Sequence, residues 1–467
     1  MLFIEALPRQ RTLAWIAIFA LTGLVLRIAG ASGGLWLDEA WSAVLADDVQ
    51  TPMGVFISIN HDNNHHLNSV WLQTVGLDAP PLVARALSIV AGTLAIVVAG
   101  LIGLRRGPLA GIVTALLFAL SPVLVTLGSE ARGYAPMTLC VLIAAWYIDR
   151  WLDGDESADR AITIAICFFL GALFQLTILF AACALTGWPF LALWQREGLR
   201  SALIKTAQIM GPALIAVLLA TGIVFAPTVI GGAEFRFGSY QDFTVLLFLR
   251  GMMDLLGWMI GVTTISFWVP AGAVILVVLA RSFGTPRLAF YWLAIVAFPL
   301  TVAALQTMNA GHGRYYLLAG LALLLLIGEA AAAAIRAGGW RAVAAGLGLA
   351  AFAGASAAAD IDLIRNQRGD SAGSARALRA LAPKGTDVMI DRETGSALMR
   401  TAAAQIGYDA RMTRGCPAAP FLFVDWFNGE EGSTGPVTRC GVRYQPVAGA
   451  RSRGISGQNW AVYRRDN

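Results

Sequence analysis

Charged residues are scarce in this 467-residue sequence. Asp, Glu, Lys and Arg make up 13% of it, about half the share that is usual in soluble globular proteins, while 57% of the residues are hydrophobic. This balance excludes an ordinary soluble globule and predicts a polytopic membrane protein. The formal net charge is +5, but the arginines lie singly or in pairs between apolar runs and form no basic face. We therefore expect no nucleic-acid partner.

Cysteine is also rare, with five residues and no CxxC motif. Cys140, Cys167 and Cys183 fall in apolar runs, where we expect small core residues. Cys416 and Cys440 lie in the polar C-terminal part. In an extracytoplasmic domain this pair is expected to form a disulfide, whereas in the cytosol it would stay reduced.

Eleven apolar runs are interpreted as membrane spans of a mostly α-helical protein. Arg9 and Arg11 precede the first run, so we place the N-terminus in the cytoplasm. With that orientation, every loop assigned to the cytoplasm carries positive charge, from Arg105 and Arg106 to Arg336 and Arg341. Eleven crossings then leave the C-terminus outside. The runs are residues 13–29, 82–104, 109–127, 135–151, 161–179, 180–194, 206–228, 264–280, 288–306, 315–335 and 341–359.

Three segments need separate interpretations. The first run is followed by Ala29-Gly30-Ala31, which resembles a signal-peptide cleavage site, but the run is long for a signal peptide and we interpret it as a retained span. Residues 229–263 contain Arg250 and Asp254, and a twelfth span there would spoil the later arginine pattern. We expect an external helix lying at the membrane interface. A second such segment is expected at residues 55–57, within the long first external loop.

The pattern changes near residue 360. We expect a transmembrane domain over residues 1–360 and a small extracytoplasmic α/β domain over residues 361–467, with no HExxH motif or phosphate loop in it. Within the small domain, alternation and composition predict strands at residues 387–391, 421–425 and 460–463 and a helix at residues 395–406.

An acidic pair follows the first span. Asp38 and Glu39 stand between Trp36 and Trp41, and tryptophan prefers the membrane interface. Carboxylates at that depth are unusual and indicate a chemical role. The alternative is a solvated loop start with two aromatic anchors.

All four histidines fall on the predicted external side: His61, His65, His66 and His312. The first three belong to a stretch that is dense in polar side chains, including Asp62, Asn63 and Asn64. A membrane-lying loop must satisfy the polar groups that it buries, so this stretch predicts a substrate pocket. A metal site that uses His65, His66 and His312 is a second possibility, and simple solvation is a third.

Three arginines break the positive-inside pattern or lie at an external helix end. Arg132 follows Glu130 and precedes Tyr134, Arg314 precedes Tyr315, and Arg85 begins the second span. An external arginine is suited to hold an anion, and phosphate is the commonest anion at a membrane surface. Alternatively, Arg132 and Glu130 form an ion pair within the turn, and Arg85 snorkels or pairs with Asp78.

The order of Leu37-Asp38-Glu39, Arg85-Ala86-Leu87-Ser88, Glu130-Ala131-Arg132-Gly133-Tyr134 and Arg314-Tyr315-Tyr316 resembles the polyprenyl-phosphate-dependent GT-C glycosyltransferases. The most similar members are bacterial relatives of the protein O-mannosyltransferases and the lipid A aminoarabinose and galacturonic acid transferases (families 39 and 83). The resemblance covers about residues 10–340. It implies a monomeric, multi-pass enzyme of the inner membrane.

The resemblance also implies a reaction. A sugar would pass, with inversion, from a polyprenyl-phosphate donor to lipid A, a polysaccharide or a protein at the outer face. Asp38 would be the general base with Glu39 beside it, Arg132, Arg314 and Arg85 would hold the donor phosphate, and His312 is the nearest match to a metal ligand. The Asn63-Asn64-His65-His66 cluster departs from the family's pattern, so the resemblance assigns it no role. From the polar residues themselves, we expect a substrate pocket lined by Asp62, Asn63, Asn64, His65, Glu130, Tyr134 and Tyr315.

Two other functions fit the same composition. A transporter or flippase of a lipid-linked sugar also needs polar groups within the membrane, but such proteins tend to contain internal repeats and none is found here. An oligosaccharide ligase or polymerase would use a longer lipid-linked donor, and the sequence does not separate it from a single-sugar transferase.

Overall fold

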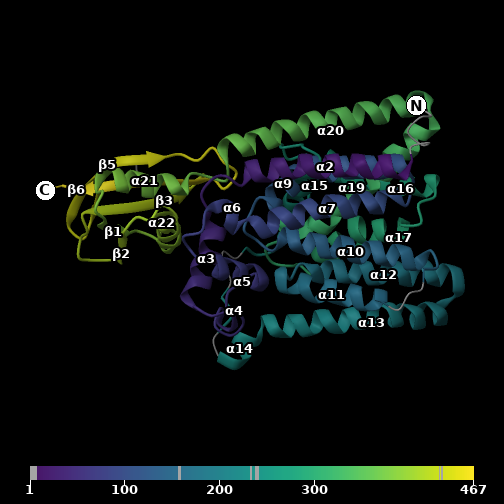
Figure 1. Ribbon diagram of the computed structural model, residues 1–467, viewed down its shortest axis with the longest axis horizontal. Coiled ribbons are helices and arrows are strands. Elements are labelled where there is room, and N and C mark those ends of the chain that lie inside the picture. The colour runs from purple at the N-terminus through teal and green to yellow at the C-terminus, as the bar shows by residue number, and fades with distance from the viewer. Residues whose placement is uncertain are drawn as a thin grey trace.

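The computed structural model describes residues 8–155, 159–231, 234–236, 241–430, 432 and 435–466. Long helices run side by side along one axis, and a small domain containing a sheet lies beyond one end of them (Figure 1). Four short helices of the first loop, α3 to α6, lie at the same end, between the helix bundle and the sheet.

Every predicted apolar run forms a helix or a broken helix. The elements are α2 (Arg9–Gly30), α7 (Ala86–Leu104), α8 (Pro108–Leu120) with α9 (Pro122–Gly128), α10 (Tyr134–Leu152), α11 (Asp159–Phe174), α12 (Ile178–Glu197), α13 (Leu199–Val224), α16 (Trp268–Ala280) with η1 (Arg281–Phe283), α17 (Leu288–Tyr291) with η2 (Trp292–Ala297) and α18 (Phe298–Ala304), α19 (Leu317–Ala337) and α20 (Gly339–Asn366).

The protein is thus a multi-pass membrane protein. Among the described residues, six helices are long and apolar enough to cross a bilayer, or seven if α8 and α9 form one span with a 61° bend. Pro122 stands at that bend, where it begins α9. Helices α16 and α17 to α18 are apolar but shorter. The number of eleven spans therefore stays a prediction, because several of the eleven are short or broken helices.

The first loop and the segment after α13 are helical, as expected. The first loop contains α3 (Leu37–Asp48), α4 (Pro52–Ile57), α5 (His66–Val75) and α6 (Pro81–Ala84). The later segment contains α14 (Ala226–Gly231) and α15 (Val245–Met259), followed further on by η3 (Gly313–Tyr316). Helix α15 packs against η3, α19 and α9, so it closes one side of the bundle.

The end of the bundle opposite the C-terminal domain contains a buried ionic cluster, where the sequence predicts only charged cytoplasmic loops. Arg287 is 1% exposed and donates to Asp149 (Nη2–Oδ2 2.7 Å), to Glu329 and to the carbonyl of Ile102 (2.8 Å). Arg105 and Arg106 also bind Asp149. These arginines are bonded to carboxylates of α10 and α19 and connect the helices there.

The C-terminal domain is a mixed six-stranded sheet in the order β2-β1-β3-β6-β5-β4. Strand β1 pairs in parallel with β2 and β3, and the remaining pairs are antiparallel. The predicted strands and helix are present as β1, β3, β6 and α22, while α21, β2, β4 and β5 were not predicted. The elements are α21 (Ser371–Leu381), β1 (Thr386–Ile390), α22 (Glu393–Gln405), β2 (Ala410–Arg414), β3 (Phe421–Phe427), β4 (Val437–Arg439), β5 (Val442–Ala450) and β6 (Gln458–Arg465).

A disulfide joins Cys416 to Cys440 in this domain (S–S 2.00 Å). It connects the segment before β3 to the turn between β4 and β5, and so ties the edge strands to the centre of the sheet.

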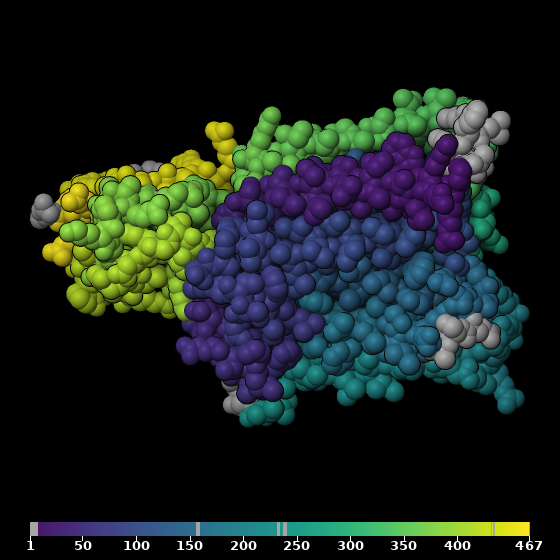
Figure 2. Space-filling model, viewed as in Figure 1, coloured from purple at the N-terminus to yellow at the C-terminus, as the bar shows by residue number. Residues whose placement is uncertain are grey.

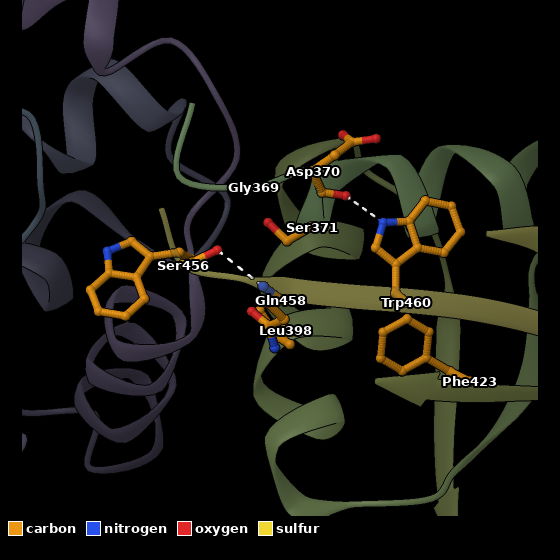
Figure 3. Close-up of a pocket in the computed structure, with 9 residues that line it drawn as sticks. Gly369, Asp370, Ser371, Leu398, Phe423, Ser456, Gln458 and Trp460 are labelled. Carbon is orange, nitrogen blue, oxygen red and sulfur yellow. Dashed lines mark hydrogen bonds between the residues drawn. The ribbon is translucent and has the colours of Figure 1, made fainter. Parts of the chain in front are cut away.

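The small domain packs against the first loop, and the two are in continuous contact in Figure 2. Ser371 Oγ donates to the carbonyl of Leu35 (2.6 Å), and Gln367 accepts from the amide of Gly33 (3.0 Å). Arg400 of α22 binds Asp47 and Asp48 of α3. Trp36 lines a small cavity of about 10 Å³ together with residues around α21 and β6, several of which are shown in Figure 3. The C-terminal domain therefore contacts the loop that carries Asp38 and stabilises its position.

Candidate active site

Asp38 and Glu39 occupy the first turn of α3, and the helix sends their side chains in different directions because successive residues are separated by about 100°. Glu39 points into the protein and is fully buried, whereas Asp38 is 22% exposed. The two neighbouring carboxylates therefore meet different partners.

Glu39 forms a closed ion pair with Arg85. Its oxygens accept from Arg85 (Oε1–Nε 2.8 Å, Oε2–Nη2 2.6 Å) and from the amides of Ala131 (2.6 Å) and Trp36 (3.0 Å). The remaining Arg85 donors bind the carbonyls of Ala31, Gly33 and Gly34. All five N–H groups of this guanidinium are thus occupied. Arg85 has no donor left for a phosphate in this arrangement, so its geometry is that of a positioning residue for the loop.

Asp38 instead bridges two arginines from different parts of the chain. Its Oδ2 lies 2.9 Å from Arg132 Nη1 and 3.1 Å from Arg314 Nη1. Oδ1 forms no hydrogen bond with any residue that the structure describes. One oxygen is therefore anchored while the other can accept a proton.

The two arginines have unused donors. Among the described residues, Nε of Arg132 and Nε of Arg314 are buried and have no hydrogen-bond partner. Arg132 also donates to Asn63 Oδ1 (2.5 Å), and the amide group of Asn63 donates to Ser42 Oγ (3.0 Å) and the carbonyl of Asp38 (2.8 Å). Asn63 thus orients Arg132 and α3 together, and leaves guanidinium donors for an anion.

Electrostatics keep Asp38 ionised. Burial raises the pKa of the Asp38 carboxyl, but Arg132 and Arg314 outweigh burial and bring the pKa below its ordinary value. In this state Asp38 is a weak base, because both positive charges act on it.

A cavity of about 550 Å³ extends from these arginines. Its polar end contains Arg132, Arg314, Tyr134 and Tyr315, together with Asp62, Asn63, Asn64, His65 and His66 of the histidine-rich stretch. Its other walls are apolar side chains of α11, α12, α13 and the neighbouring segments, including Leu173, Phe174, Leu179, Phe180, Val224, Phe225 and Met308. This size and polarity suit a ligand with one anionic group and a long apolar part.

The histidine-rich stretch is held in place by hydrogen bonds. Asn64 donates to the carbonyl of Val55 (2.9 Å), and His65 Nδ1 lies 3.0 Å from the carbonyl of Phe174. That contact requires Gly133, because a side chain at this position would collide with the Phe174 carbonyl. Since the carbonyl needs a donor, Nδ1 carries the hydrogen, and the buried Nε2 is an acceptor without a partner among the described residues.

The proposed metal site is not assembled. No three His, Cys, Asp or Glu side chains among the described residues lie close enough to share a metal ion. His65 and His66 are bonded to Phe174 and Asn64, and burial lowers their pKa, to about 4 for His66. His312 lies beside Tyr315 and Arg314, whose positive charge adds to burial in lowering its pKa. The histidines expected to bind a metal are therefore not gathered at one point in the part of the chain that the structure describes.

A second cavity of about 370 Å³ adjoins the first and shares Tyr134 and Arg314 with it. It is bounded by Glu130, Trp36, Trp258 and Arg368. Arg368 lies in the segment between α20 and α21, 3.2 Å from Glu130 Oε1 and 4.1 Å from the centre of a Trp36 ring. Burial raises the pKa of Glu130, while Arg368 opposes that shift.

Arg368, Ser42 and Trp258 were not expected as site residues. Arg368 carries the same signal as Arg132, since it is an arginine on the side predicted to be external. The sequence does not show that the linker after α20 returns to the acidic pair, 330 residues earlier in the chain.

Solved structures share this architecture. ArnT from Cupriavidus metallidurans in the apo state aligns with a TM-score of 0.55 and 14% identity over 85% of each chain. The same protein bound to undecaprenyl phosphate aligns with a TM-score of 0.54 and 13% identity, over 96% of this chain and 98% of that one. The protein has a GT-C fold.

The oligosaccharyltransferase of Archaeoglobus fulgidus, in complex with Zn and sulfate, also shares the GT-C fold. Its TM-score is 0.50 at 14% identity, over 85% of this chain and 62% of that one. No protein-family model matches the sequence, and no curated protein matches it. At these identities the likeness concerns the fold, so the role of each residue in this chain has to be argued from its own geometry.

Proposed function

We propose that the protein is an inverting glycosyltransferase that takes a sugar from a polyprenyl-phosphate donor at the outer face of the inner membrane. The observation that carries this proposal is that Asp38 is bonded to Arg132 and Arg314, which line the polar end of a cavity with apolar walls. The ArnT structure that contains undecaprenyl phosphate adds support, since it has the same fold.

The donor phosphate would bind Arg132 and Arg314 through their free donors, with the polyprenyl chain along Leu173, Phe180 and Phe225. Arginine is suited to this task because its planar group binds phosphate oxygens with fixed geometry. As the bond from the anomeric carbon to the phosphate oxygen breaks, its electron pair goes to the phosphate, and the arginines stabilise the added charge.

The acceptor would enter through the second cavity, between Glu130, Trp258 and Arg368. Its hydroxyl oxygen attacks the anomeric carbon from the opposite face, and Asp38 Oδ1 takes the hydroxyl proton. The products are an inverted glycoside and polyprenyl phosphate. Binding of the donor phosphate also offsets the arginine charges, so it raises the pKa of Asp38 and makes it a better base.

Glu39, Arg85 and Arg368 act through other residues in this proposal. Glu39 and Arg85 position the loop that carries Asp38, and Arg368 positions Glu130 and Trp36 in the acceptor cavity. The C-terminal domain would be extracytoplasmic, and the Cys416–Cys440 disulfide supports an oxidising compartment.

The reaction can be tested with purified protein, undecaprenyl-phosphate sugars and a membrane extract as the source of acceptors. We expect release of undecaprenyl phosphate that depends on both the extract and Asp38. A transporter would move the donor across vesicles without releasing undecaprenyl phosphate, and that result would contradict the proposal. Analysis of the glycosylated product would then separate transfer of a single sugar from transfer of an oligosaccharide.

A further inference from the structure

A third cavity, the basic cavity, lies at the end of the helix bundle opposite Asp38. Its volume is about 600 Å³. It is formed where α2 begins and α7 and α10 end, and α7 packs against both of the other helices. Since α7 begins at the Asp38 end and has 19 residues, the two sites are separated by about 28 Å.

Three arginines and one aspartate line the basic cavity, so its charge is positive. Arg105 binds Asp149 and Asp153, and Arg150 binds Asp155 (Nε–Oδ2 2.9 Å). The other oxygen of Asp155 is bound by Arg160. Arg9 forms no hydrogen bond or ion pair with the residues that the structure describes, and its side chain is exposed. Its charge is therefore available to an anion.

The remaining lining is apolar and belongs to membrane-spanning helices. Leu101 and Leu104 come from α7, and Trp146 comes from α10, with the Arg150 guanidinium 4.9 Å from the centre of its ring. A soluble anion would gain nothing from these walls. A phospholipid gains from both parts, because its phosphate meets the arginines and its acyl chains meet the leucines.

We propose that the basic cavity binds an anionic phospholipid of the leaflet opposite the candidate active site. The lipid would connect α2 to α7 and α10 through its phosphate. This site is independent of the proposed glycosyl transfer, because it shares no residue with either cavity at the Asp38 end.

The test is a titration of full-length, delipidated protein in detergent with phosphatidylglycerol or phosphatidylcholine, followed by native mass spectrometry. We expect phosphatidylglycerol to bind several-fold more tightly than phosphatidylcholine. Arg9→Gln should lower the affinity for phosphatidylglycerol by about fivefold, whereas Arg9→Lys should keep most of it, because the favourable effect of one basic residue is electrostatic.

Arg11→Gln is the matched control, since Arg11 is an exposed arginine on the same helix that does not line the cavity. It should bind both lipids as the parent does, and Arg314→Gln should also leave this binding unchanged. Equal binding of the two lipids, or equal losses in Arg9→Gln and Arg11→Gln, would overturn the proposal. Displacement of the lipid by millimolar inorganic phosphate would assign the cavity to a soluble anion and would also overturn it.

Discussion

The two arginine–carboxylate clusters of the helical domain differ in how completely their central arginines are bonded. At one end, Arg287 is bonded to Asp149, Glu329 and the carbonyl of Ile102 and lines none of the cavities described above, although Arg105, which also binds Asp149, lines the basic cavity. At the other end, Arg132 and Arg314 share Asp38 and keep unused donors; both line the first cavity, and Arg314 also lines the second. The residue types are the same, so the difference lies in the bonds that remain to be made. A saturated cluster contributes to structure, whereas an open one is ready for a ligand.

The largest effect should follow from breaking the saturated cluster. Arg287→Met removes the arginine that pairs with buried Glu329 and one of the three arginines that bind Asp149, and leaving the Glu329 charge unpaired costs about 3–5 kcal/mol. We expect a large fall in thermal stability in detergent and little change in undecaprenyl phosphate affinity of the protein that remains folded. Unchanged thermal stability would show that water reaches this cluster and that Arg287 does not have the structural role assigned to it.

Glu39→Gln tests whether Glu39, the neighbour of Asp38, has a structural role like that of the fully bonded cluster around Arg287. The change leaves Arg85 buried without its counter-charge, so we expect a loss of stability of about 3 kcal/mol, and lower turnover because Asp38 is misplaced. Thermal unfolding and kcat are measured together. If the variant unfolds at the same temperature as the parent but has no turnover, Glu39 is instead a catalytic residue.

Arg132→Gln and Arg314→Gln test the open cluster. Each change removes a charged donor to the phosphate, so undecaprenyl phosphate should bind about tenfold more weakly. Arg106→Gln is a control with an arginine at the far end. Binding of undecaprenol, which lacks the phosphate, should be equal in all three variants. If undecaprenyl phosphate binds the two site variants as it binds the parent, both arginines are structural.

The smallest effect concerns pH. Asp38 must be ionised to act as a base, so activity is lost as pH falls through its pKa, which the arginines lower in the free protein. Since bound donor offsets those charges, the acid limb of kcat should lie at higher pH than the acid limb of kcat/KM. The donor is a phosphodiester and does not itself titrate in this range. Coincident limbs would mean that donor binding does not reach Asp38.

Much of this organisation is visible in the sequence. The apolar runs mark the helices because a membrane span needs a long uncharged stretch, and the C-terminal strands β1, β3 and β6 alternate or are strongly apolar. The short strands β2, β4 and β5 were missed because they are edge or half-exposed strands with little apolar pattern.

The site was harder to predict than the fold. Arg132 and Arg314 stood out because they are charges in loops that the sequence predicts to be external, and the structure brings both to Asp38. Charge placement alone could not separate Arg85 from them, because saturation depends on the carbonyls of residues 31–34, which the folded loop supplies. Similarly, the histidine-rich stretch suggested a metal site, and only the fold shows that His65 contacts the carbonyl of Phe174 and that His66 contacts Asn64.

The role of Asp38 as the general base is tested most directly by measuring turnover and donor affinity in Asp38→Asn. This change keeps the shape of the side chain and removes the proton acceptor, so kcat should fall by about 10²–10⁴-fold while undecaprenyl phosphate still binds. Correct folding is checked by parental thermal stability. An Asp38→Asn protein that folds, binds the donor lipid and transfers sugar at the parental rate would contradict the assignment of this cluster as the catalytic centre.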